Sequence, residues 1–194
     1  MASILIDVAA HPFCAKAIAF EPNPDAVVVI DKSLKLNSLV NITVISKALG
    51  HVKMTQRMSF GSHSPTASLL STESLAGSGV DVDVSTLDSE IDALTFTESN
   101  VILLVDVEGY ELNVLSGGKG LIQKYSPLIV FEYHQETKKV FGLDELRNLL
   151  GDEYQIYRVR QDAMLDGDVE NAWNCVAIPR NTQFAAVLQS RIIA

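Results

Sequence analysis

The chain has 194 residues, of which 47% are apolar, and it carries a formal net charge of −9 with a pI near 4.8. This is enough apolar material for a single folded domain, which we expect to span residues 1–194. An acidic surface repels phosphate backbones, so nucleic acid is excluded as a partner. No apolar run reaches the ~18 residues of a membrane helix, and no basic flank marks a signal peptide. Two distant cysteines, Cys14 and Cys175, form no disulfide framework, which favours a reducing, cytoplasmic location.

The start of the chain leaves two interpretations open. Ile4–Val8 can be a first strand, or Ser3–Ala10 can be an amphipathic helix, and we favour the helix because its apolar residues share one face. Ala17–Phe20 then predicts a short strand. Asn23 caps a following helix and Pro24 suits its first turn, although the β-branched run in its middle favours a strand locally.

Later in the chain, short apolar runs alternate with helical patterns, which indicates βαβ units and an α/β fold with a mostly parallel sheet. Residues 51–84 are expected to be an irregular excursion, with a short strand at 80–84. The run Val101–Val105 predicts a central strand buried on both faces, and Trp173 is expected in the core. The other expected strands are 41–46, 127–133, 154–159 and 175–178, the last two forming an antiparallel pair; the expected helices are 86–93, 111–125 with a break near Gly117–Gly118, 143–150 and 182–193.

Polar side chains follow three of the predicted strands. Glu21 ends the first, and a carboxylate there can accept hydrogen bonds from ribose hydroxyls, or it can simply cap a turn. Asp106 and Glu108 follow the predicted central strand, and both would share one face if the strand persisted that far. They can position a substrate hydroxyl, remove its proton or bind an ammonium group, or they can cap the next helix.

Glu132 and His134 share one face at the end of the strand 127–133. His134 has the intrinsic pKa of a general base near neutral pH, although a lone histidine at a strand end is often structural. Together with Asp106 and Glu108 these residues can hold a divalent metal. Their spacing matches no specific metal motif, so no metal is predicted.

Five segments, in this order and at these separations, resemble the FkbM family of methyltransferases over roughly residues 17–180. They are AFEPNP (19–24), NITVISKALG (41–50), STLD (85–88), LLVDVEGYELNVL (103–115) and PLIVFEYH (127–134). The resemblance implies a Rossmann-like methyltransferase fold and transfer of a methyl group from S-adenosylmethionine to a hydroxyl of a sugar, polyketide or lipid-like small molecule.

By this resemblance, Glu21 would hold the ribose of the cofactor, and the region around Ser46 to Ala48 would lie beside the adenine; Asn23 is a further cofactor-binding candidate. Asp106 would serve both the cofactor and the methyl-transfer centre, to which Glu108, Glu132 and His134 are assigned as further catalytic candidates.

Two departures from the family pattern stand out. The family places a strand ending in Asp-Val-Gly-Ala-Asn before the segment at residue 19, whereas Asp7–His11 here contains no glycine. The second departure is Leu104, where the family often has lysine. The first strand is therefore absent or rearranged, as it would be in a truncated open reading frame.

The predicted function is S-adenosylmethionine-dependent O-methyl transfer to a small hydroxyl-bearing acceptor, with no role for membranes or nucleic acid. The alternative is a truncated, non-catalytic domain of the same fold that acts as an interaction module. A nucleotide-dependent oxidoreductase is disfavoured because no Gly-x-Gly-x-x-Gly sequence follows any predicted strand.

Overall fold

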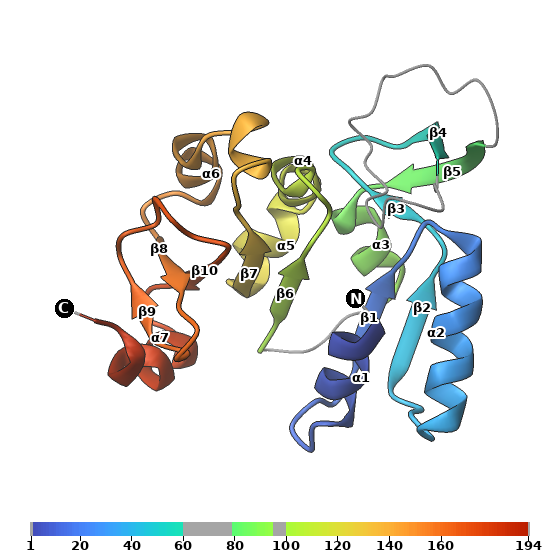
Figure 1. Cartoon of the computed structure of the whole chain (residues 1–194), viewed down its shortest axis with the longest axis horizontal. Helices are drawn as coiled ribbons and strands as arrows, with labels where there is room; N and C mark the ends of the chain where they lie inside the picture. Colours follow the sequence, from blue (N-terminus) through green and yellow to red (C-terminus); the bar gives the residue numbers. More distant parts are fainter. Residues whose placement is uncertain (1, 60–78, 95–99, 194) are drawn as a thin grey trace.

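The computed structural model describes residues 2–59, 79–94 and 100–193, which form a mixed α/β arrangement (Figure 1). The elements in chain order are α1 (Ala2–Ala10), β1 (Ala17–Phe20), α2 (Pro24–Leu36), β2 (Ile42–Ile45), β3 (Ala48–Leu49), β4 (Met54–Ser59), β5 (Gly79–Ser85), α3 (Leu87–Ala93), β6 (Ile102–Val105), α4 (Glu111–Ser116), α5 (Lys119–Tyr125), β7 (Leu128–Glu132), the 3-10 turn η1 (Thr137–Lys139), α6 (Leu143–Leu150), β8 (Tyr154–Val159), β9 (Leu165–Asp166), β10 (Asn174–Pro179), α7 (Gln183–Leu188) and η2 (Gln189–Arg191).

The first residues form the helix α1, as the amphipathic pattern predicted. Asn41, just before β2, donates from Nδ2 to the carbonyl oxygens of Ala9 (3.0 Å) and Cys14 (2.9 Å), which ties the end of α1 and the following turn to the sheet. Among the described residues no strand precedes β1. It pairs in parallel with β2 alone, so its other edge carries no neighbouring strand.

The helix α2 forms where its start signals predicted. The Asn23 side chain accepts a hydrogen bond from the N–H of Asp25 at 3.0 Å, and Pro24 occupies the first turn. The β-branched run that favours a strand is overridden because Ile30 and Leu34 gain burial on one helix face.

The largest sheet has the order β6-β7-β10-β8-β9, and only its β6–β7 pair is parallel. The expectation of a mostly parallel sheet is therefore wrong. A parallel neighbour needs a long crossover, which α4 and α5 supply between β6 and β7. The later strands follow one another without such a helical crossover between β8 and β10, so the chain returns antiparallel, as predicted for that strand pair.

The strand β6 is an edge strand of its sheet in the described structure, so the prediction of a central strand buried on both faces is also wrong. Ile102 is 61% exposed and Leu104 is 49% exposed, whereas Val105 on the other face is buried. A continuous apolar run predicts a strand correctly, but it does not reveal how many neighbours that strand finds.

The predicted excursion 51–84 contains more order than expected. β4 and β5 pair antiparallel, and β3 joins β5 in parallel to complete a small three-stranded sheet. β5 confirms the strand predicted at 80–84, whose buried Val82 and Val84 alternate with exposed Asp81 and Asp83. Residues 60–78 lie outside the described residues.

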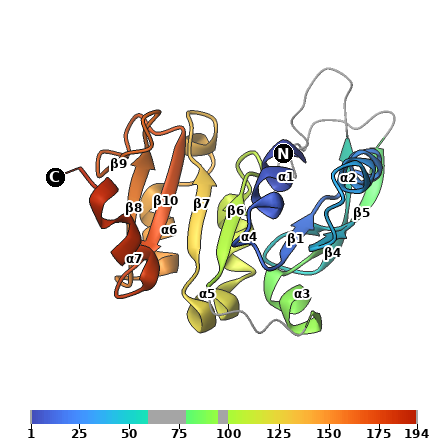
Figure 2. The same ribbon diagram turned by 90° about the horizontal axis from the view of Figure 1, so that it is seen from below.

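The core lies on both faces of the large sheet (Figure 2). On one face, Cys175 and Ala177 of β10 pack in the cluster that contains Leu146 of α6. On the other face, Val176 and Ile178 pack against α7. None of the helices in the described part of the chain combines the length and apolarity needed to cross a bilayer.

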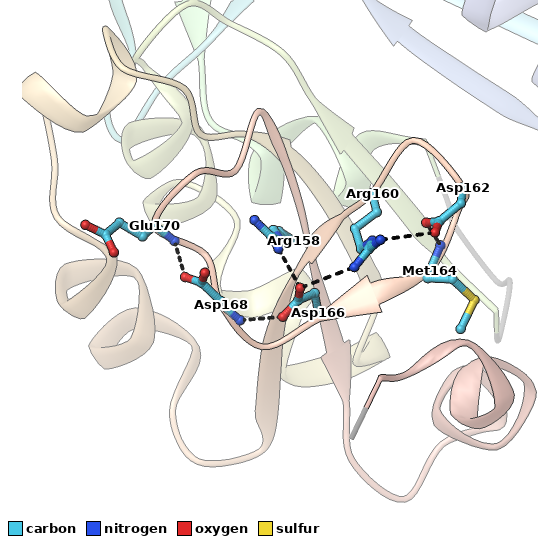
Figure 3. Close-up of polar contacts among 7 residues, drawn as sticks. All are labelled: Arg158, Arg160, Asp162, Met164, Asp166, Asp168 and Glu170. Carbon is cyan, nitrogen blue, oxygen red and sulfur yellow. Dashed lines mark hydrogen bonds and ion pairs between the residues drawn. The ribbon is translucent and has the colours of Figure 1, made fainter.

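The acidic loop after β8 is held by local contacts (Figure 3). Asp166 accepts from Arg158 at 2.6 Å and lies 3.9 Å from Arg160, while Asp162 lies 3.4 Å from Arg160. Asp166 also accepts the N–H of Asp168, and this bond and the Arg158 guanidinium hold the pKa of the Asp166 carboxyl below its usual range. These contacts fix the path of the chain back to β10.

A close backbone approach explains the break between α4 and α5. A Cβ atom at Gly117 would lie 2.0 Å from the carbonyl oxygen of Gly50. The predicted break at Gly117–Gly118 is therefore confirmed, and it serves to bring the start of α5 against the small sheet.

We expect Gly117→Ala to lower the free energy of unfolding by about 3 kcal/mol, the upper end of the range for overpacking. Gly167→Ala is the matched control, because nothing lies within 4 Å of a Cβ there, and its effect should stay within about 0.5 kcal/mol. Urea denaturation followed by circular dichroism measures both, and equal stabilities of the two variants would contradict the role of the approach.

Candidate functional site

Polar side chains from two strand ends meet at one edge of the large sheet. β6 and β7 run parallel, so the loop after β6 and the end of β7 leave the sheet on the same side. One side-chain ligand atom each from Glu108, Glu132 and His134 lies within 4.8 Å of the others, and all three residues are partly buried. The structure thus brings together three of the four predicted catalytic residues.

The route by which Glu108 arrives differs from the prediction. β6 ends at Val105, so strand alternation does not carry Asp106 and Glu108 onto one face. Instead, Glu108 and Gly109 both adopt positive φ angles, of 54° and 97°, and turn the chain into α4. A side chain at positive φ is strained, and such strain often accompanies functional positions.

Glu111 in the first turn of α4 orders this loop, and sequence reasoning missed it. The side chain is fully buried, and its Oε1 accepts the N–H groups of Val107 and Gly109, both at 3.2 Å. Its Oε2 has no hydrogen-bond partner in the described structure. Burial raises the pKa of Glu111 and the nearby Asp106 carboxylate adds to the rise. An acidic residue two positions after a turn glycine was the available signal.

Glu132 lies at the centre of the negative charge. Burial raises the pKa of Glu132, and the carboxylates of Asp106, Glu108 and Glu111 raise it further, while His134 opposes them. Like charges in a half-buried site cannot all ionise easily, so Glu132 is a stronger proton acceptor than an ordinary surface carboxylate.

The hydrogen bonds of His134 define what its ring can do. Nδ1 accepts the N–H groups of Glu136 (3.1 Å) and Thr137 (3.3 Å), so in the neutral ring the proton sits on Nε2. Nε2 lies 3.4 Å from Oε2 of Glu132. A histidine that binds a metal donates from its other ring nitrogen, and a histidine that acts as a base needs a free lone pair. This geometry favours neither role. Nε2 faces Glu132, but the 3.4 Å contact is not a hydrogen bond, since the buried Oε2 of Glu132 has no hydrogen-bond partner among the described residues.

The predicted cofactor residues lie at the ends of β1 and β2. The N–H of Glu21 donates to Ile45 at 3.1 Å, and its Oε1 accepts the N–H of Asn23 at 2.9 Å, so Oε2 is the carboxylate oxygen without that contact. The Asn23 side chain caps α2, and Ala48 is buried in β3. Ser46 follows β2 directly.

No hydrogen bond or ion pair among the described residues joins Glu21, Asn23, Ser46 or Ala48 to the Glu132 cluster. Figure 1 shows β1, β2 and β6 pointing the same way, so their ends lie on one side of the molecule. Two cavities lie elsewhere, one of about 330 Å³ bounded by Arg147, Tyr154 and Arg180, and one of about 240 Å³ beside Asp88 and Tyr125. Neither is lined by a predicted site residue.

The comparison with protein families decides where the chain belongs. A model of the FkbM methyltransferase domain matches residues 8–159. The chain belongs to the FkbM methyltransferase family. The crystal structure of methyltransferase FkbM from Methylobacillus flagellatus KT is similar in fold, with a TM-score of 0.54 and 15% sequence identity over 84% of this chain. This chain covers 36% of that protein's length. No curated protein matches the chain.

The buried Glu111 makes stability depend on pH. Its folded-state pKa lies above the ordinary value of 4.5, so its stabilising contribution is complete below that pH and is lost as the pH rises through the folded-state pKa. Glu111→Gln keeps an acceptor for the loop and cannot ionise. The stability of the native protein relative to this variant should fall as the pH rises above about 4.5. Urea denaturation at several pH values tests this, and parallel stability curves would contradict it.

The backbone strain at Glu108 predicts that replacing this residue with glycine makes the protein more stable. Glu108→Gly should raise the free energy of unfolding by about 0.5–1 kcal/mol, because glycine tolerates positive φ and its own chain entropy offsets part of the gain. Ala163→Gly, also at positive φ (59°) but outside the site, should give a similar gain. Thermal unfolding of both variants measures the effect; destabilisation by Glu108→Gly alone would show that its side-chain contacts outweigh the strain.

Proposed function

We propose that this chain binds S-adenosylmethionine and transfers its methyl group to a hydroxyl of a small molecule or sugar. The observation that carries the proposal is the cluster of Glu108, Glu132 and His134 at the ends of the parallel strands β6 and β7. It occurs in a chain that belongs to a methyltransferase family.

The charge of the cluster fits a cationic methyl donor. Three carboxylates raise the pKa of Glu132, and His134 opposes them. A sulfonium is a positive charge that such a cluster attracts. Glu21 would hold the ribose through Oε2, since Oε1 is engaged by Asn23.

The amino-acid end of the cofactor receives no assigned residues. The first glycine of the chain is Gly50, so no glycine-rich turn precedes β1. The backbone amides that such a turn would offer to a carboxylate have no counterpart in residues 2–16, where α1 is followed by a short connection. We therefore assign residues to the ribose and the sulfonium only.

The chemistry that S-adenosylmethionine supplies when bound is an electrophilic methyl group. The residues of the chain would contribute positioning and proton removal. Glu132, with its raised pKa, is the favoured base for the acceptor hydroxyl. His134, through the proton on Nε2, would orient the Glu132 carboxylate, and Asp106 and Glu108 would bind neighbouring donor groups.

Isothermal titration calorimetry with S-adenosylmethionine tests the cofactor assignment. Glu21→Gln should weaken binding by about 1–3 kcal/mol because a charge-assisted hydrogen bond to the ribose is lost. Asp31→Asn, an exposed carboxylate on α2, is the control and should bind like the native protein. Absence of binding by the native protein at millimolar cofactor would overturn the function, whereas unchanged affinity of Glu21→Gln would overturn only the role of Glu21.

A further inference from the structure

Trp173 lies at the surface beside the carboxylate cluster, which corrects the expectation that it is a core residue. Trp173 is 67% exposed. The loop that ends at β10 places it there, because its carbonyl oxygen accepts the N–H of Tyr133 at 2.9 Å. The next residue, Asn174, pairs with Glu132. Tryptophan is usually largely buried and stabilises a fold by that burial. An indole this exposed contributes little to the core, and its apolar face is available to a ligand.

The indole continues the chain of contacts that begins at Glu132. The ring centroids of Trp173 and His134 lie 5.2 Å apart with a tilt of 59°. The same imidazole places Nε2 at 3.4 Å from Glu132. An exposed aromatic surface, an imidazole and a half-buried carboxylate therefore follow one another across one small area.

The charges around this area are one-sided. Asp106, Glu108 and Glu111 act on Glu132 as like charges, and His134 opposes them. One further cation lies nearby, Lys138, whose Nζ donates to the carbonyl oxygen of Glu170 and lies 5.2 Å from the centre of the Tyr133 ring. An indole face attracts cations through its quadrupole, and nearby carboxylates strengthen that preference.

We propose that Trp173 is a specificity residue that receives the positively charged group of an ammonium-bearing hydroxyl acceptor beside Glu132. This inference rests on the proposed methyl-transfer function and names the acceptor class. The ammonium lies against the indole, and the acceptor hydroxyl reaches towards the carboxylate cluster. A neutral acceptor of the same shape loses the attraction to both the indole face and the carboxylates.

Intrinsic tryptophan fluorescence measures this contact directly, because Trp173 is the only tryptophan in the sequence. Choline and its neutral isostere 3,3-dimethylbutan-1-ol are titrated against the native chain while tryptophan emission is followed, with sodium chloride as the ionic-strength control. Choline should change the emission in a saturable way at concentrations about tenfold lower than the neutral alcohol, a ratio that corresponds to ~1.4 kcal/mol of cation–π and charge attraction. Equal titrations by the two compounds, or no saturable change with choline, would overturn the proposal.

Two variants separate a specific contact from general attraction to an acidic protein. Glu132→Gln keeps the tryptophan and should weaken choline binding about fivefold or more, the effect of removing one partly buried charge. Glu153→Gln removes an exposed carboxylate next to Tyr154, which pairs with Pro179 at the far end of β10, and should leave choline binding unchanged. Equal losses in both variants would indicate diffuse charge and overturn the assignment.

The titration needs no methyl donor, so its failure is distinct from failure of the proposed function. Loss of the choline preference together with intact S-adenosylmethionine binding would remove the acceptor class alone. Trp173→Phe, followed by calorimetry with choline, adds a direct check, since phenylalanine keeps an aromatic face and should retain part of the affinity that Trp173→Ala abolishes.

Discussion

The parallel register of β6 with β7 is the constraint on which the site depends. Leu104 pairs with Val130 and Val105 with Phe131, so both strands leave the sheet at the same level. Everything polar that follows them in the sequence must then occupy one small region. A shift of this register would move Glu108 away from Glu132, so the three side chains would no longer lie together, although each strand would still form.

The same arrangement concentrates negative charge in a partly buried site. Glu111 is spent on ordering the loop, and its buried oxygen without a partner is a cost that the rest of the fold must offset. Glu132 is left with a raised pKa, and its Oε2 faces Nε2 of His134 at 3.4 Å without a hydrogen bond. The site is thus less stable than a neutral packing would be, and it is suited to accepting a proton or a cation.

Local signals predicted the elements in which neighbouring residues decide the outcome. The cap at Asn23 and the glycine break at Gly117 were both visible, because capping and turn formation involve groups a few residues apart. The helix at residues 2–10 was favoured for its apolar face. Within residues 51–84 the strand at 80–84 was predicted, whereas β4 was missed, because this polar strand forms only against β5.

Features that depend on distant partners were not readable in this way. Val101–Val105 was predicted to be a central strand because an apolar run is the same whether a strand has one neighbour or two. Trp173 was predicted to lie in the core because it is a large aromatic residue before a strand. Its exposure is set by the acidic loop and by the hydrogen bond from Tyr133, which only the folded chain forms. The sequence by itself determined most of the helices, the apolar strands and the charged residues at strand ends, since these follow from periodicity and local hydrogen bonding. Only the tertiary structure decided that Glu108, Glu132 and His134 meet, which proton His134 carries, and that an indole stands open beside them, because each of these depends on strand register and on backbone groups that only the folded chain brings within reach.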